Sequence, residues 1–306
     1  MVNDKGAHLG GVIAAMATPF DAEGRVDLAG AEALAAALVA EGNQGLVVTG
    51  STGESSVLDD AERIELWRCV ARAVDVPVLA GSTSNDTRHS VELTSAAARC
   101  GVAGILAVVP YYNRPSQAGL EAHFRAVAAA TELPVVLYDI PARTGRKLAA
   151  ETVLRLAEDV ENVVGLKDAA ADVAATGRLL AAAPDGFTCW SGDDALTLPF
   201  LAVGAIGVIS VISHWAAPEV AEMVRRFLAG ELGRALELQR RLLPSFAFLS
   251  SDAAPNPVPT KAMLRVMGLP AGQCRLPLGD APPGLEDTAK VVLGELEAAR
   301  RADPRT

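Results

Sequence analysis

The chain has few residues of the kinds that bind metals or form covalent cross-links. Among its 306 residues there are four cysteines, which lie far apart and form no CxxC pair. The sequence therefore signals neither a disulfide framework nor a zinc site. The histidines are equally scattered, so we expect no metal and no organic cofactor. The cysteines are Cys69, Cys100, Cys189 and Cys274, and the histidines are His8, His89, His123 and His214.

Positive charge is also scarce. The formal net charge is -10 at pH 7, and no run of Lys or Arg concentrates positive potential. This composition argues against binding to the phosphate backbone of nucleic acid. No segment approaches the ~18 consecutive apolar residues that a membrane span needs, and residues 1–10 lack the basic and then apolar pattern of a signal peptide. We expect a cytoplasmic protein with neither a nucleic-acid nor a membrane partner.

Short runs rich in β-branched residues alternate with longer Ala/Leu/Arg/Glu-rich segments of helical period. This alternation predicts parallel strands joined by crossover helices. The predicted strands are Val12–Ala17, Gly45–Thr49, Val76–Ala80, Gly104–Val109, Pro134–Tyr138, Val163–Lys167, Phe187–Trp190 and Ile206–Val211. The predicted helices are Leu28–Glu41, Asp60–Val74, Thr87–Cys100, Gln117–Thr131, Ala150–Ala157, Val173–Ala182, Leu196–Ala202 and Pro218–Ala229.

Eight βα units without a long polar linker fit a TIM (β/α)8 barrel, an α/β fold, better than an open sheet. The main alternative is a doubly wound sheet, but its Gly-rich first-turn fingerprint is absent. After Gly230 the strands stop and helical stretches continue, at Glu231–Leu249, Pro259–Met267 and Leu285–Arg301. We therefore predict a catalytic barrel over residues 1–230. A helical region over residues 231–306 is expected to cover the barrel or mediate assembly.

Lys167 is the strongest candidate for chemistry. It is one of only five lysines and follows the apolar run Val163–Leu166, at the end of a predicted strand. Burial disfavours an ammonium and lowers its pKa, so such a side chain can act as a neutral amine that attacks a carbonyl. Alternatively, its stem packs while its ammonium reaches water. The other lysines, in a predicted tail, loop or helix, are expected to be solvated: Lys5, Lys147, Lys261 and Lys290.

Hydroxyl and phenol groups follow three other predicted strands. Ser51 and Thr52 lie in the turn Gly50–Glu54, which is either a nest of backbone N–H groups for a small carboxylate or an ordinary turn that caps the next helix. The chain has three tyrosines, and all of them lie at strand ends: Tyr111, Tyr112 and Tyr138. A phenol near the amine can move protons, because its hydroxyl both donates and accepts. A rim tyrosine that only packs is the alternative.

Four further residues lie after the fifth and seventh predicted strands or within the eighth. Arg143 can hold a carboxylate with two parallel hydrogen bonds, or can form an ordinary surface ion pair. Asp193 and Asp194 are expected to cap the next helix, and we assign them no chemistry. Ile209, with its glycine neighbours, is expected to wall a pocket small enough for a two- or three-carbon acid.

Taken together, these motifs resemble the dihydrodipicolinate synthase family of pyruvate-dependent class I aldolases. The similarity runs from about Gly11 to Leu278. It is carried by Gly50-Ser51-Thr52-Gly53-Glu54, Tyr111-Tyr112-Asn113-Arg114-Pro115, Tyr138 with Pro141 and Arg143, Gly165-Leu166-Lys167-Asp168, Pro255-Asn256-Pro257 and Arg275-Leu276-Pro277-Leu278.

The resemblance implies a homotetramer, built as a dimer of dimers, that condenses pyruvate with aspartate 4-semialdehyde. Lys167 would form the Schiff base with pyruvate, and Tyr138 would shuttle protons. Ser51 and Tyr112 would complete the proton relay, with Tyr112 reaching in from the neighbouring subunit. The carboxylate-binding groups it implies are Thr52 and the main chain beside Ile209 for pyruvate, and Arg143 for the aldehyde substrate. No metal or organic cofactor is implied.

Some residues depart from the family pattern. Ser51 stands where synthases usually carry Thr, and a Gly-Ser-Thr-Gly-Glu turn is also similar to that of N-acetylneuraminate lyases. A lyase for N-acetylneuraminate or a 2-keto-3-deoxy sugar acid is therefore one alternative function. A barrel that binds a keto acid for regulation, without turnover, is another. Asp60, Arg63 and His89 replace residues seen in lysine-sensitive members, so we expect weak or no inhibition by lysine.

Overall fold

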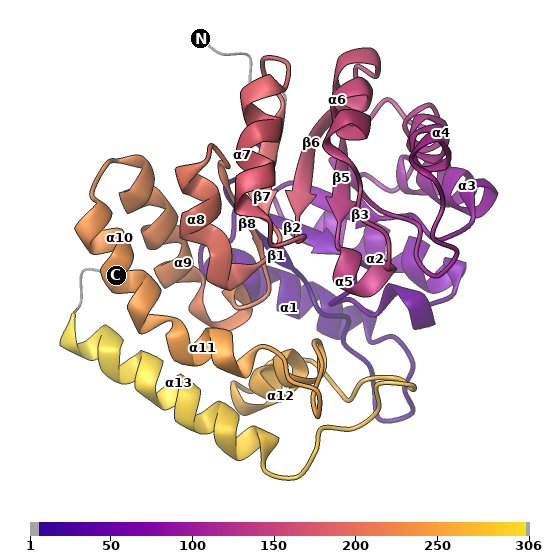
Figure 1. Cartoon of the computed structure of the whole chain (residues 1–306). Helices are drawn as coiled ribbons and strands as arrows, with labels where there is room; N and C mark the ends of the chain where they lie inside the picture. Colours follow the sequence, from indigo (N-terminus) through magenta and orange to yellow (C-terminus); the bar gives the residue numbers. More distant parts are fainter. Residues whose placement is uncertain (1–5, 304–306) are drawn as a thin grey trace.

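The computed structural model of the protein describes residues 6–303. Within this range, eight parallel strands form a closed barrel in which β1 pairs with β8 and every other strand pairs with its neighbours in sequence. The TIM barrel predicted from the sequence is confirmed (Figure 1). The strands are β1 (Val12–Ala15), β2 (Gly45–Val48), β3 (Val78–Gly81), β4 (Gly104–Val108), β5 (Val135–Asp139), β6 (Val163–Asp168), β7 (Thr188–Ser191) and β8 (Gly207–Ser210).

The barrel interior is filled by apolar side chains. Successive residues of a strand point to opposite faces, so alternate positions fill the inside and the others meet the surrounding helices. Ile13 of β1 pairs with Ile209 of β8 where the barrel closes. Both belong to one buried interior cluster that also contains Leu9, Ala15, Val47, Leu79, Leu106, Val136, Tyr138, Val164 and Trp190.

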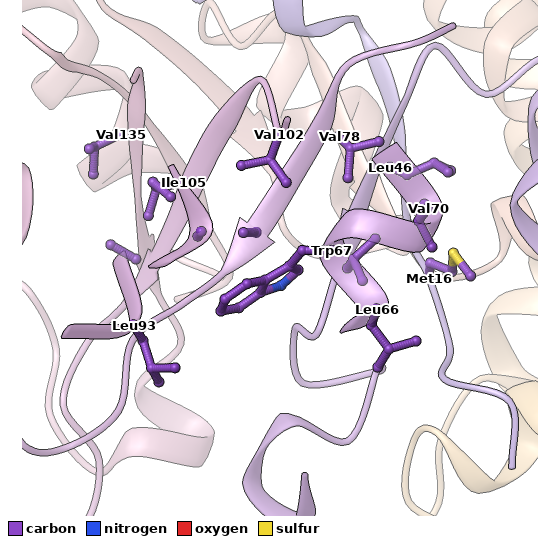
Figure 2. Close-up of a cluster of buried hydrophobic side chains, with 14 of the residues drawn as sticks. Met16, Leu46, Leu66, Trp67, Val70, Val78, Leu93, Val102, Ile105 and Val135 are labelled. Carbon is purple, nitrogen blue, oxygen red and sulfur yellow. The ribbon is translucent and has the colours of Figure 1, made fainter. Parts of the chain in front are cut away.

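Helices surround the barrel at the predicted places. They are α1 (Leu28–Ala40), α2 (Asp60–Ala73), α3 (Thr87–Ala97), α4 (Gln117–Ala128), α6 (Ala150–Asp159), α7 (Val173–Ala182), α8 (Thr197–Ala202) and α9 (Ser213–Leu228). Several begin at a residue whose side chain accepts a backbone N–H, as at the capping box of Asp59 and Glu62 on α2. Figure 2 shows Leu66, Trp67 and Val70 of α2 among the apolar side chains between helices and barrel.

Three helical segments differ from the prediction. The predicted stretch Glu231–Leu249 forms two helices that meet at Leu242. α9 begins at Ser213 rather than at Pro218, because a first turn continues into the helix across a kink at Ala216. Pro218 follows this kink, where the missing N–H of a proline costs little in a new first turn. The short helix α5 (Pro141–Thr144) was not predicted. Four residues are too few to show a helical period, although Pro141 at its start and Gly145 at its end (φ 71°) are typical boundary residues.

The C-terminal helices are α10 (Leu232–Arg241), α11 (Leu243–Phe248), α12 (Val258–Val266) and α13 (Leu285–Ala302). Of these, α11, α12 and α13 lie on the side of the barrel toward which the arrows of β5 and β6 point, whereas α10 packs beside α9 (Figure 1). Apolar residues of these helices form one buried cluster with α9 and β8. Parallel strands of a TIM barrel carry the reactive groups at their carboxyl ends, so α11, α12 and α13 approach the expected active-site face. The division at residue 230 stays a prediction.

One lysine does not lie where the sequence predicted. Lys261, which we expected to be solvated, is 0% exposed on α12, and its Nζ lies 2.6 Å from Glu54 Oε1. Helical periodicity could not reveal this, because the partner carboxylate comes from the turn after β2, far away in sequence. Lys147 and Lys290 pair with Asp172 and Asp287 at the surface, as solvated lysines do. Lys5 lies outside the described residues. Among residues 6–303, we find no helix with the length and apolar character that a membrane span requires.

Candidate active site

Lys167 lies at the carboxyl end of β6 and is buried, with 4% of its surface exposed. Burial lowers the pKa of its amine to about 8. The charge of Asp194 opposes this shift, and the nearby Arg143 adds to it. At pH 7 about one tenth of such a group is neutral, against about one in three thousand for a lysine of ordinary pKa. The amine is therefore available as a nucleophile.

Tyr138 lies next to Lys167, on the adjacent strand β5. Their Cα atoms are paired in the β5–β6 ladder, and Lys167 Nζ lies 4.3 Å from the centroid of the phenol ring. Burial raises the pKa of Tyr138 to about 12, while a hydrogen bond with Ser51 and the charge of Arg143 oppose that rise. The phenol is therefore protonated near neutral pH. It can pass this proton on and recover it, which suits a relay beside an amine.

A cavity of about 260 Å³ joins these residues at the mouth of the barrel. Its volume suits a small acid rather than a nucleotide. Most of the side chains predicted from the sequence lie around it, although they come from different βα loops. Its lining includes Ser51, Thr52, Tyr138, Arg143, Lys167 and Asp194.

The two predicted carboxylate-binding side chains are held by the same residue. Thr52 is buried, and its Oγ1 accepts a hydrogen bond from Asn256 Nδ2 at 2.9 Å. Arg143, on α5, donates from Nη2 to the main-chain oxygen of Asn256 at 3.1 Å. Arg143 also lines the cavity, and its guanidinium has further N–H donors.

Two predicted residues lie apart from the cavity. Tyr112 is 89% exposed and has a positive φ of 73°, whereas its neighbour Tyr111 lines an adjoining hollow with Ser51 and Arg143. Ile209 is 1% exposed and packs in the barrel interior with Tyr138. Val211, two residues further along the chain, takes the place at the cavity wall that we predicted for the Ile209 side chain. A role for the main chain beside Ile209 stays a prediction.

Known proteins are similar to this sequence over nearly its whole length. The pattern of the family described as the Dihydrodipicolinate synthetase family matches residues 8–294. The chain belongs to this family. The family predicted from the motifs is therefore confirmed.

Curated relatives in this family include proteins named 4-hydroxy-tetrahydrodipicolinate synthase. The one from Symbiobacterium thermophilum is 49% identical, over 94% of this chain and 97% of the relative. The one from Bacillus subtilis is 45% identical, over 89% of this chain and 93% of the relative. A solved synthase from Cyanidioschyzon merolae with lysine bound has a TM-score of 0.92 and 42% identity, and covers 95% of this chain and 99% of its own.

Asp194 is a site residue that the sequence analysis missed in this dihydrodipicolinate synthetase family member. It is 3% exposed, and its carboxylate accepts from Ser210 Oγ at 2.5 Å and from Val211 N at 2.8 Å. Burial raises the pKa of Asp194, and its charge in turn raises the pKa of Lys167. The available signal was a second aspartate directly after a strand end. Asp193 does cap the following turn, through Ala195 N at 2.9 Å.

Of the three residues on which the expectation about lysine rests, two form a pair and the third is buried. His89 Nε2 lies 2.9 Å from Asp60 Oδ1. Arg63 is 5% exposed and donates to the main-chain oxygen of Ser55. Burial lowers the pKa of Arg63, and the charge of Asp60 counters that shift. Nε and Nη1 of Arg63 have no hydrogen-bond partner among the described residues. The expectation of weak or no inhibition by lysine stays a prediction.

Proposed function

We propose that the protein condenses pyruvate with aspartate 4-semialdehyde to form 4-hydroxy-tetrahydrodipicolinate, a step of lysine and diaminopimelate biosynthesis. The observation that carries this proposal is a buried amine of lowered pKa, Lys167, beside a protonated phenol, Tyr138, in a small cavity. The names of the relatives support the identity of the product. The buried amine of Lys167 supports a nucleophile that attacks a ketone.

The reaction would begin with attack of the neutral Lys167 amine on the keto carbon of pyruvate. Loss of water from the resulting carbinolamine gives an iminium, which withdraws electrons from the neighbouring methyl group. Loss of a methyl proton then gives an enamine. The enamine carbon attacks the aldehyde of the second substrate, whose oxygen takes up a proton. The amine of that substrate finally displaces Lys167 from the iminium carbon and closes the ring.

Tyr138 would carry the protons of these steps, and its hydrogen bond with Ser51 supports a relay that begins there. We assign the next place in the relay to Tyr112 of a neighbouring subunit. Supporting this, Tyr112 is 89% exposed and does not line the cavity of its own chain. This assignment requires an assembly of at least two subunits, and we propose a homotetramer built as a dimer of dimers. We also propose that the protein works in the cytoplasm.

The carboxylate of pyruvate would be bound by Thr52 and by the main chain near Ile209. Arg143 lines the same cavity as Thr52 and Lys167, which supports binding of both carboxylates there. A guanidinium offers two parallel hydrogen bonds to a carboxylate. Arg143 would therefore hold the carboxylate of aspartate 4-semialdehyde.

The proposal is tested by giving the purified protein pyruvate with one aldehyde at a time. We expect pyruvate to be consumed with aspartate 4-semialdehyde and not with N-acetylmannosamine or other sugar aldehydes. Turnover of a sugar aldehyde alone would identify a sugar-acid lyase, the alternative that Ser51 leaves open. If neither the protein nor its Ser51→Thr variant consumes any aldehyde, the barrel is a regulatory keto-acid binder instead.

A further inference from the structure

We infer that Asn256, a residue of the C-terminal region, positions both carboxylate-binding groups of the active site and sets Thr52 as a hydrogen-bond donor toward the keto acid. This inference rests on the proposed function, because it assigns a device for holding the substrates of that reaction. It extends the site beyond the barrel, to a segment that joins α11 and α12.

The side chain of Asn256 is fixed on both sides. Its Nδ2 donates to Thr52 Oγ1 at 2.9 Å, and its Oδ1 accepts from Thr260 Oγ1 at 2.8 Å. Asn256 is 8% exposed, and Thr260, on α12, is 0% exposed. An amide held between two buried hydroxyls is fixed in its plane, because rotation out of that plane breaks both hydrogen bonds.

This arrangement decides what Thr52 can do. A hydroxyl has one proton to donate and lone pairs to accept with. Since Thr52 already accepts from the Asn256 amide, its own proton remains available. A donor that faces the cavity suits a carboxylate, which can only accept. Asn256 lines the same cavity, but its Nδ2 and Oδ1 are engaged by Thr52 and Thr260. We therefore assign it a role through Thr52, as a positioning residue.

The main chain of Asn256 holds the second group. Its carbonyl oxygen accepts from Arg143 Nη2 at 3.1 Å, and its own N–H donates to Ser250 Oγ at 3.3 Å. One residue thus links the turn after β2 to the helix after β5. Replacing its side chain removes the contact with Thr52 and leaves the carbonyl that supports Arg143, so the two effects can be measured separately.

The test measures how pyruvate concentration affects trapping of the protein by borohydride, which reports pyruvate binding without the second substrate. We expect Asn256→Ala to raise the half-saturating pyruvate concentration by about three- to tenfold, the usual effect of losing one hydrogen bond. The trapping rate at saturating pyruvate and the KM for the aldehyde should change less than twofold. In a Thr52→Val background, Asn256→Ala should cause no further rise.

Two further variants keep the inference falsifiable. Thr260→Val, which removes only the hydroxyl that orients the amide, should raise half-saturation in the same direction by less, even if Asn256→Ala fails to fold. Asn43→Ala is the matched control, because Asn43 is also buried and donates to Leu38 O at 2.9 Å and Ser213 O at 3.1 Å, before the amino end of β2. It should lower thermal stability without changing half-saturation.

The outcomes separate the inference from the proposed function. If the unaltered protein forms no reducible adduct with pyruvate, the proposed function fails. If it forms the adduct but neither the Asn256 nor the Thr260 variant changes half-saturation, the positioning role is wrong. An effect of Asn256→Ala that is equally large with and without Thr52→Val, or equal losses for pyruvate and aldehyde, would also overturn it.

Discussion

The buried ion pair between Lys261 and Glu54 should be a main support of the turn that carries Ser51 and Thr52. Both side chains are at most 1% exposed, and Lys261 Nζ also lies 3.9 Å from the centroid of the Phe20 ring. Glu54 has a positive φ of 55° and accepts from the main-chain N–H of Arg275 at 2.9 Å. We expect Lys261→Met, which keeps the side-chain length, to leave the Glu54 charge without its main partner.

Removing one member of a buried ion pair costs about 3–5 kcal/mol, because the other charge stays buried and uncompensated. The unfolding entropy is about 2.1 cal/mol/K per residue. Over 306 residues, this loss of stability corresponds to a fall in the unfolding midpoint of about 5–8 °C. The pKa of Lys261 is lowered by burial, and the charge of Glu54 opposes this shift. The attraction between the two charges therefore offsets the cost of burying them only while both charges are present.

The assay is thermal unfolding followed by circular dichroism, at one protein concentration for all variants. Lys290→Met is the control, because Lys290 pairs with Asp287 at the surface, where its side chain is 62% exposed, and should hardly move the midpoint. A Glu54→Gln/Lys261→Met double variant should recover more than half of the loss, since neither charge of the pair remains. A midpoint within about 1 °C of the unaltered protein for Lys261→Met would refute the reasoning, since a buried unpaired charge must cost more than that.

Three other predictions concern the active site and the response to lysine. The rate of borohydride trapping with pyruvate should rise with pH through about 8, as the Lys167 amine loses its proton. Asp194→Asn removes a charge that raises this pKa, so the midpoint of the pH profile should move to lower pH. An unchanged midpoint would contradict the assignment. Tyr138→Phe should lower kcat by about 10²- to 10⁴-fold, as expected for loss of a proton-transfer group, with no change in the circular dichroism spectrum; a loss of less than threefold would argue against a proton relay. L-Lysine should inhibit turnover weakly or not at all, because His89 already pairs with Asp60; half-inhibition at or below the low millimolar range would show this to be wrong.

The barrel could be predicted because periodicity is a local property. Every predicted strand exists, with ends within two residues of the prediction. Knowing the strands and the fold also places Lys167 and Tyr138 together, since groups at the carboxyl ends of barrel strands share one face. The pairing of Tyr138 with Lys167 in the ladder is then a consequence of register.

What the sequence could not predict are contacts that cross from the C-terminal region to the barrel. Asn256 is separated from Thr52 by more than two hundred residues along the chain, and no period relates them. Lys261 was expected to be solvated because an isolated helix segment does not reveal what it packs against. Asp194 was assigned no chemistry, because an aspartate after a strand is usually a cap, and its neighbour Asp193 is one.

The central claim is that the Lys167 amine forms a covalent bond to pyruvate. The protein should be incubated with pyruvate, reduced with borohydride, digested and mapped by mass spectrometry, alongside a Lys167→Arg variant. We predict one added pyruvate-derived group per chain, on the peptide that contains Lys167, and none in the variant. An unmodified Lys167 at saturating pyruvate, or a modification on another lysine, would contradict the account.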